Sequence, residues 1–296
     1  MQTRYRAAAT ALLLTATAGL AATGGAAEAS GTHHTSARAT KTLTVTIKST
    51  KHGPVLSTTR LRPGKTLFKV VRAGAGGTMQ VLRLRSGYTV RQANKDFAAM
   101  FGPNSTAKVV QRVDKNVVFY GGIDVPAKGA PANFWGVDLD RADTYYVANL
   151  QSNAKTVLKA RGTHQRRALP SPTGWLNAAT SDGGANVFVA PKTDPHRGWM
   201  KTTNKAKEPH FLVLNQVTEP TTVQDIVDYF MSGDQNPPSF GRSGFTETNV
   251  ISPGHTFVWK YRVPRGKYAV MCFWPSKTDG VTPHAAMGMI TLFHMV

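Results

Sequence analysis

An internal repeat constrains this chain more than any other feature of its sequence. The segment 79–84 parallels 210–215, and 143–149 parallels 266–272. A fixed order of similar segments within one chain indicates two copies of one structural unit. The sequence therefore predicts two related domains, which is also what a length of 296 residues favours.

Alternating hydrophobicity indicates that each copy is built from β-strands. Leu43, Val45 and Ile47 alternate with polar residues, which is the period of a strand with one buried face. Turn sequences such as Ser252-Pro253-Gly254 separate the runs. These patterns predict an all-β fold with many short strands.

One helical insertion is expected in each copy, after the first repeated segment. Apolar residues at helical spacing share one face in both insertions. They are Val90, Ala93, Phe97 and Met100 in the first copy, and Val223, Ile226, Val227 and Phe230 in the second. Thr221 or Thr222 is expected to cap the second helix, with Asp225 in its first turn.

The beginning of the chain has the pattern of an export signal. Arg4 and Arg6 precede an Ala- and Leu-rich run over 7–22, and Ala27-Glu28-Ala29 is a small-x-small cleavage sequence. The run is too short to serve as a transmembrane anchor, and no later segment is long and apolar enough to span a bilayer. We therefore expect a secreted, extracytoplasmic protein.

The expected organisation has five parts. A signal peptide occupies residues 1–29, and a flexible polar leader occupies 30–40. One domain spans 41–161, a linker rich in Pro, Ser, Thr and Gly spans 162–183, and a second domain spans 184–296.

A net charge of +20 limits the choice of partners. The basic residues are scattered rather than clustered, which is typical of a solvated basic surface and argues against a nucleic-acid site. For an exported protein, the charge favours a partner such as an anionic cell-surface polymer or an acidic protein. The oligomeric state is left open.

The single cysteine, Cys272, cannot form an internal disulfide, so it is a buried apolar residue, an intermolecular link, a reactive thiol or a metal ligand. It shares one face of an expected strand with Tyr268 and Val270, because side chains alternate along a strand. A loop of eleven residues leads from it to His284, and Met287 and Met289 follow.

A thiolate, two imidazoles and a thioether form a ligand set that suits copper in both of its oxidation states. His210 is the best candidate for the second imidazole, because it opens an apolar strand directly after Glu208-Pro209. The first copy has Met79 and Asn149 at the positions that align with His210 and Cys272, so it is not expected to bind metal in the same way.

These motifs resemble the cupredoxins, the plastocyanin–azurin group of blue-copper proteins. The resemblance rests on Pro209-His210, Ser252-Pro253-Gly254, Gly266-x-Tyr268-x-Val270-x-Cys272, and His284 followed by Gly288-Met289. It covers about 184–296 and extends weakly over 41–161. It is closer still to exported actinobacterial-type proteins with a cupredoxin-like C-terminal domain. It implies two Greek-key β-sandwiches in tandem, the first of them degenerate.

The resemblance also assigns roles to residues. It implies one type 1 copper per chain, held by His210, Cys272 and His284. Met289 is the favoured axial ligand, because its spacing from His284 is that of plastocyanin, and Met287 is the alternative, at an amicyanin-like spacing. The loop between Cys272 and His284 is longer than in most cupredoxins.

A docking patch for the redox partner is expected around the histidine that the resemblance makes the more exposed ligand, His284. Its apolar residues are Trp274, Ala285, Ala286 and Met287.

The expected function is one-electron transfer or copper holding outside the cell, with a redox protein as partner. One alternative is a metal-free binding module for an anionic cell-surface polymer or a protein. Another is a copper enzyme such as a nitrite reductase, although the remaining histidines are poorly placed for a second copper. No hydrolase signature is present, so we expect a carrier or binding protein rather than an enzyme.

Overall fold

The structure is a computed structural model that describes residues 42–103, 105–234 and 238–296. The predicted signal peptide and the flexible leader lie outside the described residues. Among the described helices, none is long and apolar enough to cross a membrane.

The first half of the described chain forms nine strands and two helices. The strands are β1 (Leu43–Thr50), β2 (Gly53–Leu56), β3 (Arg60–Leu61), β4 (Gly64–Arg72), β5 (Thr78–Leu84), β6 (Val117–Asp124), β7 (Asn133–Leu139), β8 (Asp143–Asn149) and β9 (Lys155–Ala160). Helices α2 (Val90–Met100) and α3 (Ala107–Asn116) lie between β5 and β6.

The second half repeats this order of strands. The strands are β10 (Gly174–Thr180), β11 (Asn186–Val189), β12 (Thr193–Asp194), β13 (Arg197–Asn204), β14 (Val213–Val217), β15 (Gly241–Glu247), β16 (Thr256–Arg262), β17 (Gly266–Met271) and β18 (Ile290–Met295). Helix α4 (Val223–Ser232) lies between β14 and β15, and the short 3₁₀ helix η1 (His284–Met287) precedes β18.

The sheet order confirms the internal repeat. One five-stranded sheet has the order β3-β9-β8-β5-β6, and the other has the order β12-β18-β17-β14-β15, so each strand corresponds to the one nine places later. The two halves also share one hydrogen-bonding detail. Tyr145 and Tyr268 each donate a hydrogen bond over 2.9 Å to the carbonyl four residues earlier. This tyrosine corner is a known feature of β-sandwiches.

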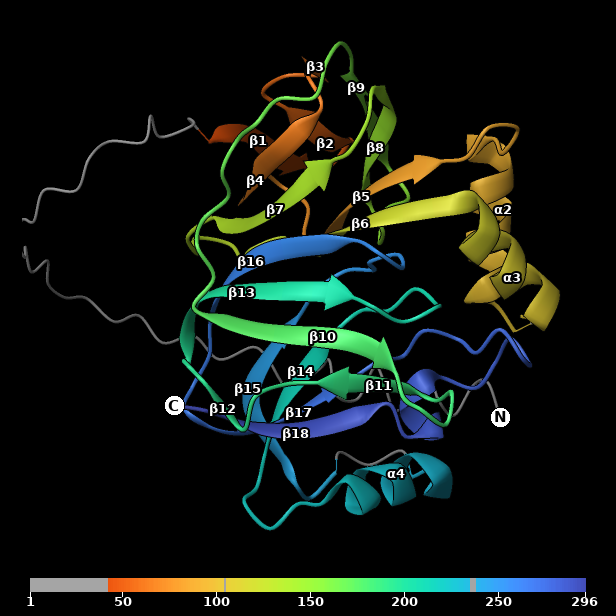
Figure 1. The fold of residues 1–296 in the computed structure, drawn as a ribbon, viewed down its shortest axis with the longest axis vertical. Helices are drawn as coiled ribbons and strands as arrows, with labels where there is room; N and C mark the ends of the chain where they lie inside the picture. Colours follow the sequence, from red (N-terminus) through yellow and green to blue (C-terminus); the bar gives the residue numbers. More distant parts are fainter. Residues whose placement is uncertain (1–41, 104, 235–237) are drawn as a thin grey trace, which may run out of the picture.

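The two halves share one continuous sheet. Its eight strands have the order β11-β10-β13-β16-β7-β4-β1-β2, with four strands from each half (Figure 1). The junction is the antiparallel pair β7–β16, in which Trp135 stands opposite Trp259. Each half forms a sandwich from one five-stranded sheet and four strands of the shared sheet. The all-β prediction of two sandwiches is thus confirmed. The two sandwiches are joined by hydrogen-bonded strands and not only by a linker.

One apolar core runs through both sandwiches. On β1, Val45 and Ile47 are fully buried between more exposed neighbours, as the period-2 pattern predicts. They belong to the same cluster as Val147 of β8, Val270 of β17 and Cys272. Cys272 therefore lies at the end of a core strand rather than on a surface loop.

The predicted helical insertions are present. Thr89 caps the N-terminus of α2, and its side chain accepts a hydrogen bond from Gln92 N–H. Thr222 caps α4 in the same way, with Asp225 completing a capping box. Helix α4 ends at Gly233 in the left-handed conformation. Figure 1 shows α2 and α3 together at one side of the first half and α4 below the second. The sequence did not predict α3.

One boundary differs from expectation. Strand β10 lies inside the segment 162–183 that the sequence predicted as a linker, and it pairs with both β11 and β13. The Gly- and Thr-rich composition of 162–183 hides a strand whose buried residues are Gly174, Leu176 and Ala178.

Candidate metal centre

Three elements bring the proposed ligands to one end of the second sandwich. His210 lies shortly before β14, Cys272 directly follows β17, and His284 begins η1. Backbone hydrogen bonds fix these positions. Ile251 N–H donates to His210 O over 2.8 Å, and Ala285 N–H donates to Cys272 O over 2.7 Å. The ligands are therefore held by the main chain and not only by their own rotamers.

The donor atoms of these residues converge. His210 Nδ1 lies 3.5 Å from Cys272 Sγ, and His284 Nδ1 lies 3.7 Å from Cys272 Sγ. The two Nδ1 atoms lie 3.1 Å apart. All three side chains are buried. Within the described ranges, they form the one cluster of three or more His, Cys, Asp or Glu residues whose ligand atoms lie close enough to hold a metal ion.

The triangle of donor atoms has the size that a metal ion needs. The point equidistant from the three atoms lies about 2.0 Å from each of them, against roughly 2.0–2.1 Å for metal–imidazole bonds and ~2.3 Å for metal–thiolate bonds. Two imidazoles and one thiolate in a trigonal arrangement form the equatorial set of a blue-copper centre. The residues present therefore fit one copper ion without rearrangement of the backbone.

Burial separates the two methionines that could serve as the axial ligand. Met289 is buried in the same core as Cys272, and its amide donates to His284 O over 2.9 Å. Met287 is 56% exposed. The left-handed Gly288 turns the chain between them from η1 into β18. A thioether ligand must face the centre, so the structure favours Met289, as the spacing did.

Glu208 orients the ring of His284. Its Oε2 lies 3.2 Å from His284 Nε2, and its other oxygen pairs with Lys277 Nζ at 3.3 Å. Burial raises the pKa of Glu208, but the hydrogen bond and charge of His284 outweigh it and lower the pKa to about 2. An ionised carboxylate only accepts hydrogen bonds, so His284 Nε2 carries a proton and Nδ1 is the ring nitrogen that faces the position of a metal.

The electrostatics of the cluster favour a thiolate. Burial alone raises the pKa of Cys272, but its contacts with His210 and His284 outweigh burial and lower that pKa to about 6. Burial lowers the pKa of His284, whereas its bonds to Cys272 and Glu208 raise it to about 9. A cysteine that ionises below neutral pH is ready to bind a metal ion.

The long loop between Cys272 and His284 packs against the first half of the chain. Ser105 donates its hydroxyl to Gly280 O, and Gln111 of α3 donates to Lys277 O over 2.9 Å. Trp274 Nε1 donates to Asp114 Oδ1 of α3 over 3.2 Å. The loop therefore reaches across to α3, and the first half supports the side of the site that this loop forms.

This packing changes the expected docking patch. Trp274 and Ala285 are buried, because α3 and the core cover them, whereas Met287 is exposed and Ala286 is half-buried. His284, expected to be the more exposed imidazole, is only 2% exposed. Two of the four residues expected in the docking patch, Trp274 and Ala285, are therefore not exposed.

Sequence reasoning missed two residues that shape the site. Glu208 stands two positions before His210, so its place in the chain offered a signal. Asp114 offered none, because it belongs to a helix of the other half that was not predicted.

The corresponding place in the first half is occupied by Asn149. Its side chain donates to Gly76 O over 2.9 Å and accepts from Gln151 N–H over 3.1 Å, so it shapes a turn. The strand register also corrects the sequence alignment. Met79 stands directly opposite Asn149, whereas His210 precedes β14 and forms its bridge with Ile251.

No protein-family model and no curated protein matches the chain. Among solved structures, reduced auracyanin from the photosynthetic bacterium Roseiflexus castenholzii is 19% identical, and the match covers 43% of this chain and 99% of that one with a TM-score of 0.26. Copper nitrite reductase from Nitrosomonas europaea is 12% identical, with 86% and 94% covered and a TM-score of 0.24. Laccase from Botrytis aclada is 11% identical, with 87% and 54% covered and a TM-score of 0.24.

TM-scores this low do not decide the fold, so the strand order and the site carry the conclusion. Both halves are β-sandwiches with the same strand order, and the second half brings a buried thiolate, two imidazoles and a thioether to one end of its core strands. The fold is cupredoxin-like, and the buried His210, Cys272, His284 and Met289 cluster resembles a type 1 copper site.

Proposed function

We propose that this protein is an electron carrier that binds one copper ion in its second half. The convergence of His210 Nδ1, His284 Nδ1 and Cys272 Sγ on a buried triangle of metal-sized dimensions carries this proposal. When bound, copper would exchange one electron by cycling between Cu(II) and Cu(I).

The residues of the chain supply rigidity and exclude water. Backbone hydrogen bonds hold both ends of the Cys272–His284 loop, and His284 N–H donates to Trp274 O over 3.0 Å. Glu208 keeps the His284 ring in one tautomer. A site whose ligands do not move needs little reorganisation when its charge changes, which favours electron transfer.

Copper holding for delivery is the less favoured reading. A delivery protein must release its metal to a partner, so at least one of its ligands must be accessible. Here His210, Cys272 and His284 are all buried, and the loop beside them is anchored on α3. Metal exchange would require this loop to open.

The proposal includes export and an acidic partner. Export rests on the basic, apolar and small-residue pattern over 4–29, and the choice of partner rests on the net charge of +20. Opposite charges on two redox proteins speed their encounter, and salt slows it.

The test is the redox cycle of the copper-loaded protein. We expect a reversible one-electron titration and fast reduction by a small donor, with the copper retained after many cycles. Rapid loss of Cu(I) to a competing chelator would instead support copper delivery. Salt-sensitive binding to an anionic polymer that survives Cys272→Ala, with no redox cycle, would support a metal-free binding module.

A further inference from the structure

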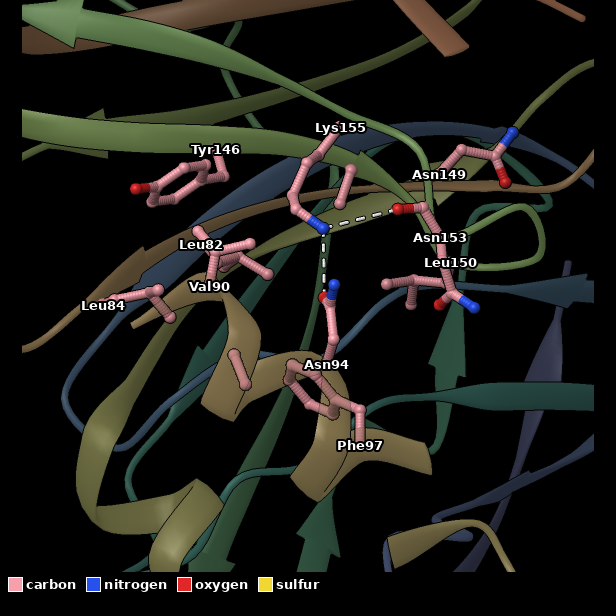
Figure 2. Close-up of a pocket in the computed structure, with 12 residues that line it drawn as sticks. Leu82, Leu84, Val90, Asn94, Phe97, Tyr146, Asn149, Leu150, Asn153 and Lys155 are labelled. Atoms are coloured by element: carbon pink, nitrogen blue, oxygen red, sulfur yellow. Dashed lines mark hydrogen bonds between the residues drawn. The ribbon is translucent and has the colours of Figure 1, made fainter. Parts of the chain in front are cut away.

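A pocket lies between the outer face of the first five-stranded sheet and helix α2. Its volume is about 40 Å³, and its walls come from β5, β8, β9, α2 and the β8–β9 turn (Figure 2). Most of the wall is apolar, and the polar groups gather where Lys155 crosses toward α2. The wall residues that matter for binding are Asn94, Ala148, Leu150, Asn153 and Lys155.

The second copy shows why this pocket is open. Strands β8 and β9 form six residue pairs that end with Ala148 opposite Lys155, and β17 and β18 form six that end with Met271 opposite Ile290. Ala148 therefore corresponds to Met271, and Lys155 corresponds to Ile290.

In the second copy, the same space is filled. Met271 and Ile290 pack against Ile226 and Phe230 of α4 in one apolar cluster. Phe273 joins them, with its ring centroid 5.4 Å from that of Phe230. The first copy has the smaller Leu150 in place of Phe273 and the small Ala148 in place of Met271. The pocket results from the loss of these side chains.

A cation stands at the mouth of the pocket, where the second copy has an isoleucine. Lys155 Nζ lies 3.0 Å from Asn94 Oδ1 of α2 and 3.5 Å from Asn153 O. Figure 2 shows the ammonium group between these two acceptors. In the part of the chain that the structure describes, Lys155 forms no ion pair with a carboxylate. The amide oxygen of Asn94 accepts from Lys155, and the NH₂ group of this pocket-lining side chain is a second kind of donor beside the ammonium group.

We propose that this pocket binds a short alkyl carboxylate, with its apolar tail between α2 and the sheet and its carboxylate on Lys155. The apolar walls select a hydrocarbon tail. The ammonium group of Lys155, which has no carboxylate partner among the described residues, selects an anion together with the neighbouring amide. A volume of about 40 Å³ equals roughly three water-sized sites, so the tail is limited to a few carbons. This site is independent of the copper centre.

The test is calorimetric titration of the mature protein with unbranched alkyl carboxylates from acetate to octanoate. Affinity should rise about fourfold for each added methylene group while the pocket fills, and it should level off near roughly four carbons. The alcohol of equal length should bind more weakly by about tenfold or more, because it lacks the charge.

Three variants locate the site, and the chain itself supplies their design. Ala148→Met copies Met271 and should abolish binding, and Ala148→Val should weaken it in proportion to its smaller volume. Lys155→Met should weaken carboxylate binding about tenfold or more but leave alcohol binding unchanged. Lys159→Met removes an exposed charge from the same strand outside the pocket and should change neither.

Three results would overturn the proposal. The first is the absence of heat of binding across the whole series. The second is equal weakening by Lys155→Met and Lys159→Met, which would indicate a general effect of charge. The third is unchanged affinity in Ala148→Met and Ala148→Val with unaltered melting temperatures, which would place the ligand elsewhere.

Discussion

Gly280 offers the sharpest test of how the first half supports the copper-type site. It lies in the Cys272–His284 loop with φ +80°, and a Cβ added there would lie 2.1 Å from the carbonyl carbon of Thr106 and 2.4 Å from the nitrogen of Ala107. Both contacts are with main-chain atoms at the start of α3, so no side-chain rotation relieves them. Gly280→Ala must therefore push the loop away from the first half.

The chain contains a matched control. Gly254 has φ +77°, and a Cβ added there would meet no atom within 4 Å. Gly254→Ala should lower the free energy of unfolding by about 1–2 kcal/mol, which is the cost of a left-handed alanine. Gly280→Ala bears the same cost and in addition loses the hydrogen bonds from Ser105 and Gln111, about 1 kcal/mol each. Its total loss should be about 3–4 kcal/mol, because moving the loop relieves the overpacking at the cost of these hydrogen bonds.

Urea unfolding of both metal-free variants measures this difference. The same loop carries Cys272 and His284 at its two ends, so Gly280→Ala should also weaken copper binding, whereas Gly254→Ala should not. Equal destabilisation of the two variants would refute the reasoning, because it would mean that the loop does not depend on its contact with α3.

Three further predictions concern carboxyl groups. Glu208→Gln removes the anionic acceptor of His284 and should lower copper affinity by about 10- to 100-fold in a chelator competition assay, with the fold unchanged. Burial raises the pKa of Asp114 to about 7, so the folded protein keeps a proton that the unfolded chain releases. Stability should therefore fall by about 3 kcal/mol between roughly pH 4 and pH 7, and a parallel unfolding series should show no such fall for Asp114→Asn. Burial raises the pKa of both Asp124 and Glu247, and the contact between the two carboxyl groups raises the pKa of Asp124 further but lowers that of Glu247. Asp124→Asn should be more stable than wild type by about 1 kcal/mol or more at pH 8 and equally stable at pH 4, and lower stability at both pH values would contradict this.

The parts of the fold that local patterns specify were predictable. Period-2 alternation puts Tyr268, Val270 and Cys272 on one face, and all three are buried. The helix caps followed from the same kind of short-range chemistry, as at Thr222. The ligand cluster could be predicted from the sequence because each ligand follows or precedes a recognisable strand.

The parts that depend on packing between the halves were not predictable. Nothing in the sequence of β7 or β16 marks them as partners across the chain, and their pairing creates the shared sheet. That arrangement places α3 over the Cys272–His284 loop and buries Trp274. The strand offset that puts Met79 opposite Asn149 was also hidden, because the repeated apolar segments align equally well two residues apart.

The central claim is that His210, Cys272 and His284 hold one copper ion in a type 1 site. Titration of the mature protein with Cu(II), followed by visible absorption and electron paramagnetic resonance, tests it most directly, with Cys272→Ser as control. We predict an intense blue band that saturates at one copper per chain, narrow copper hyperfine splitting, and the loss of both in the control. A colourless protein, or copper binding that is the same in Cys272→Ser, would contradict the account.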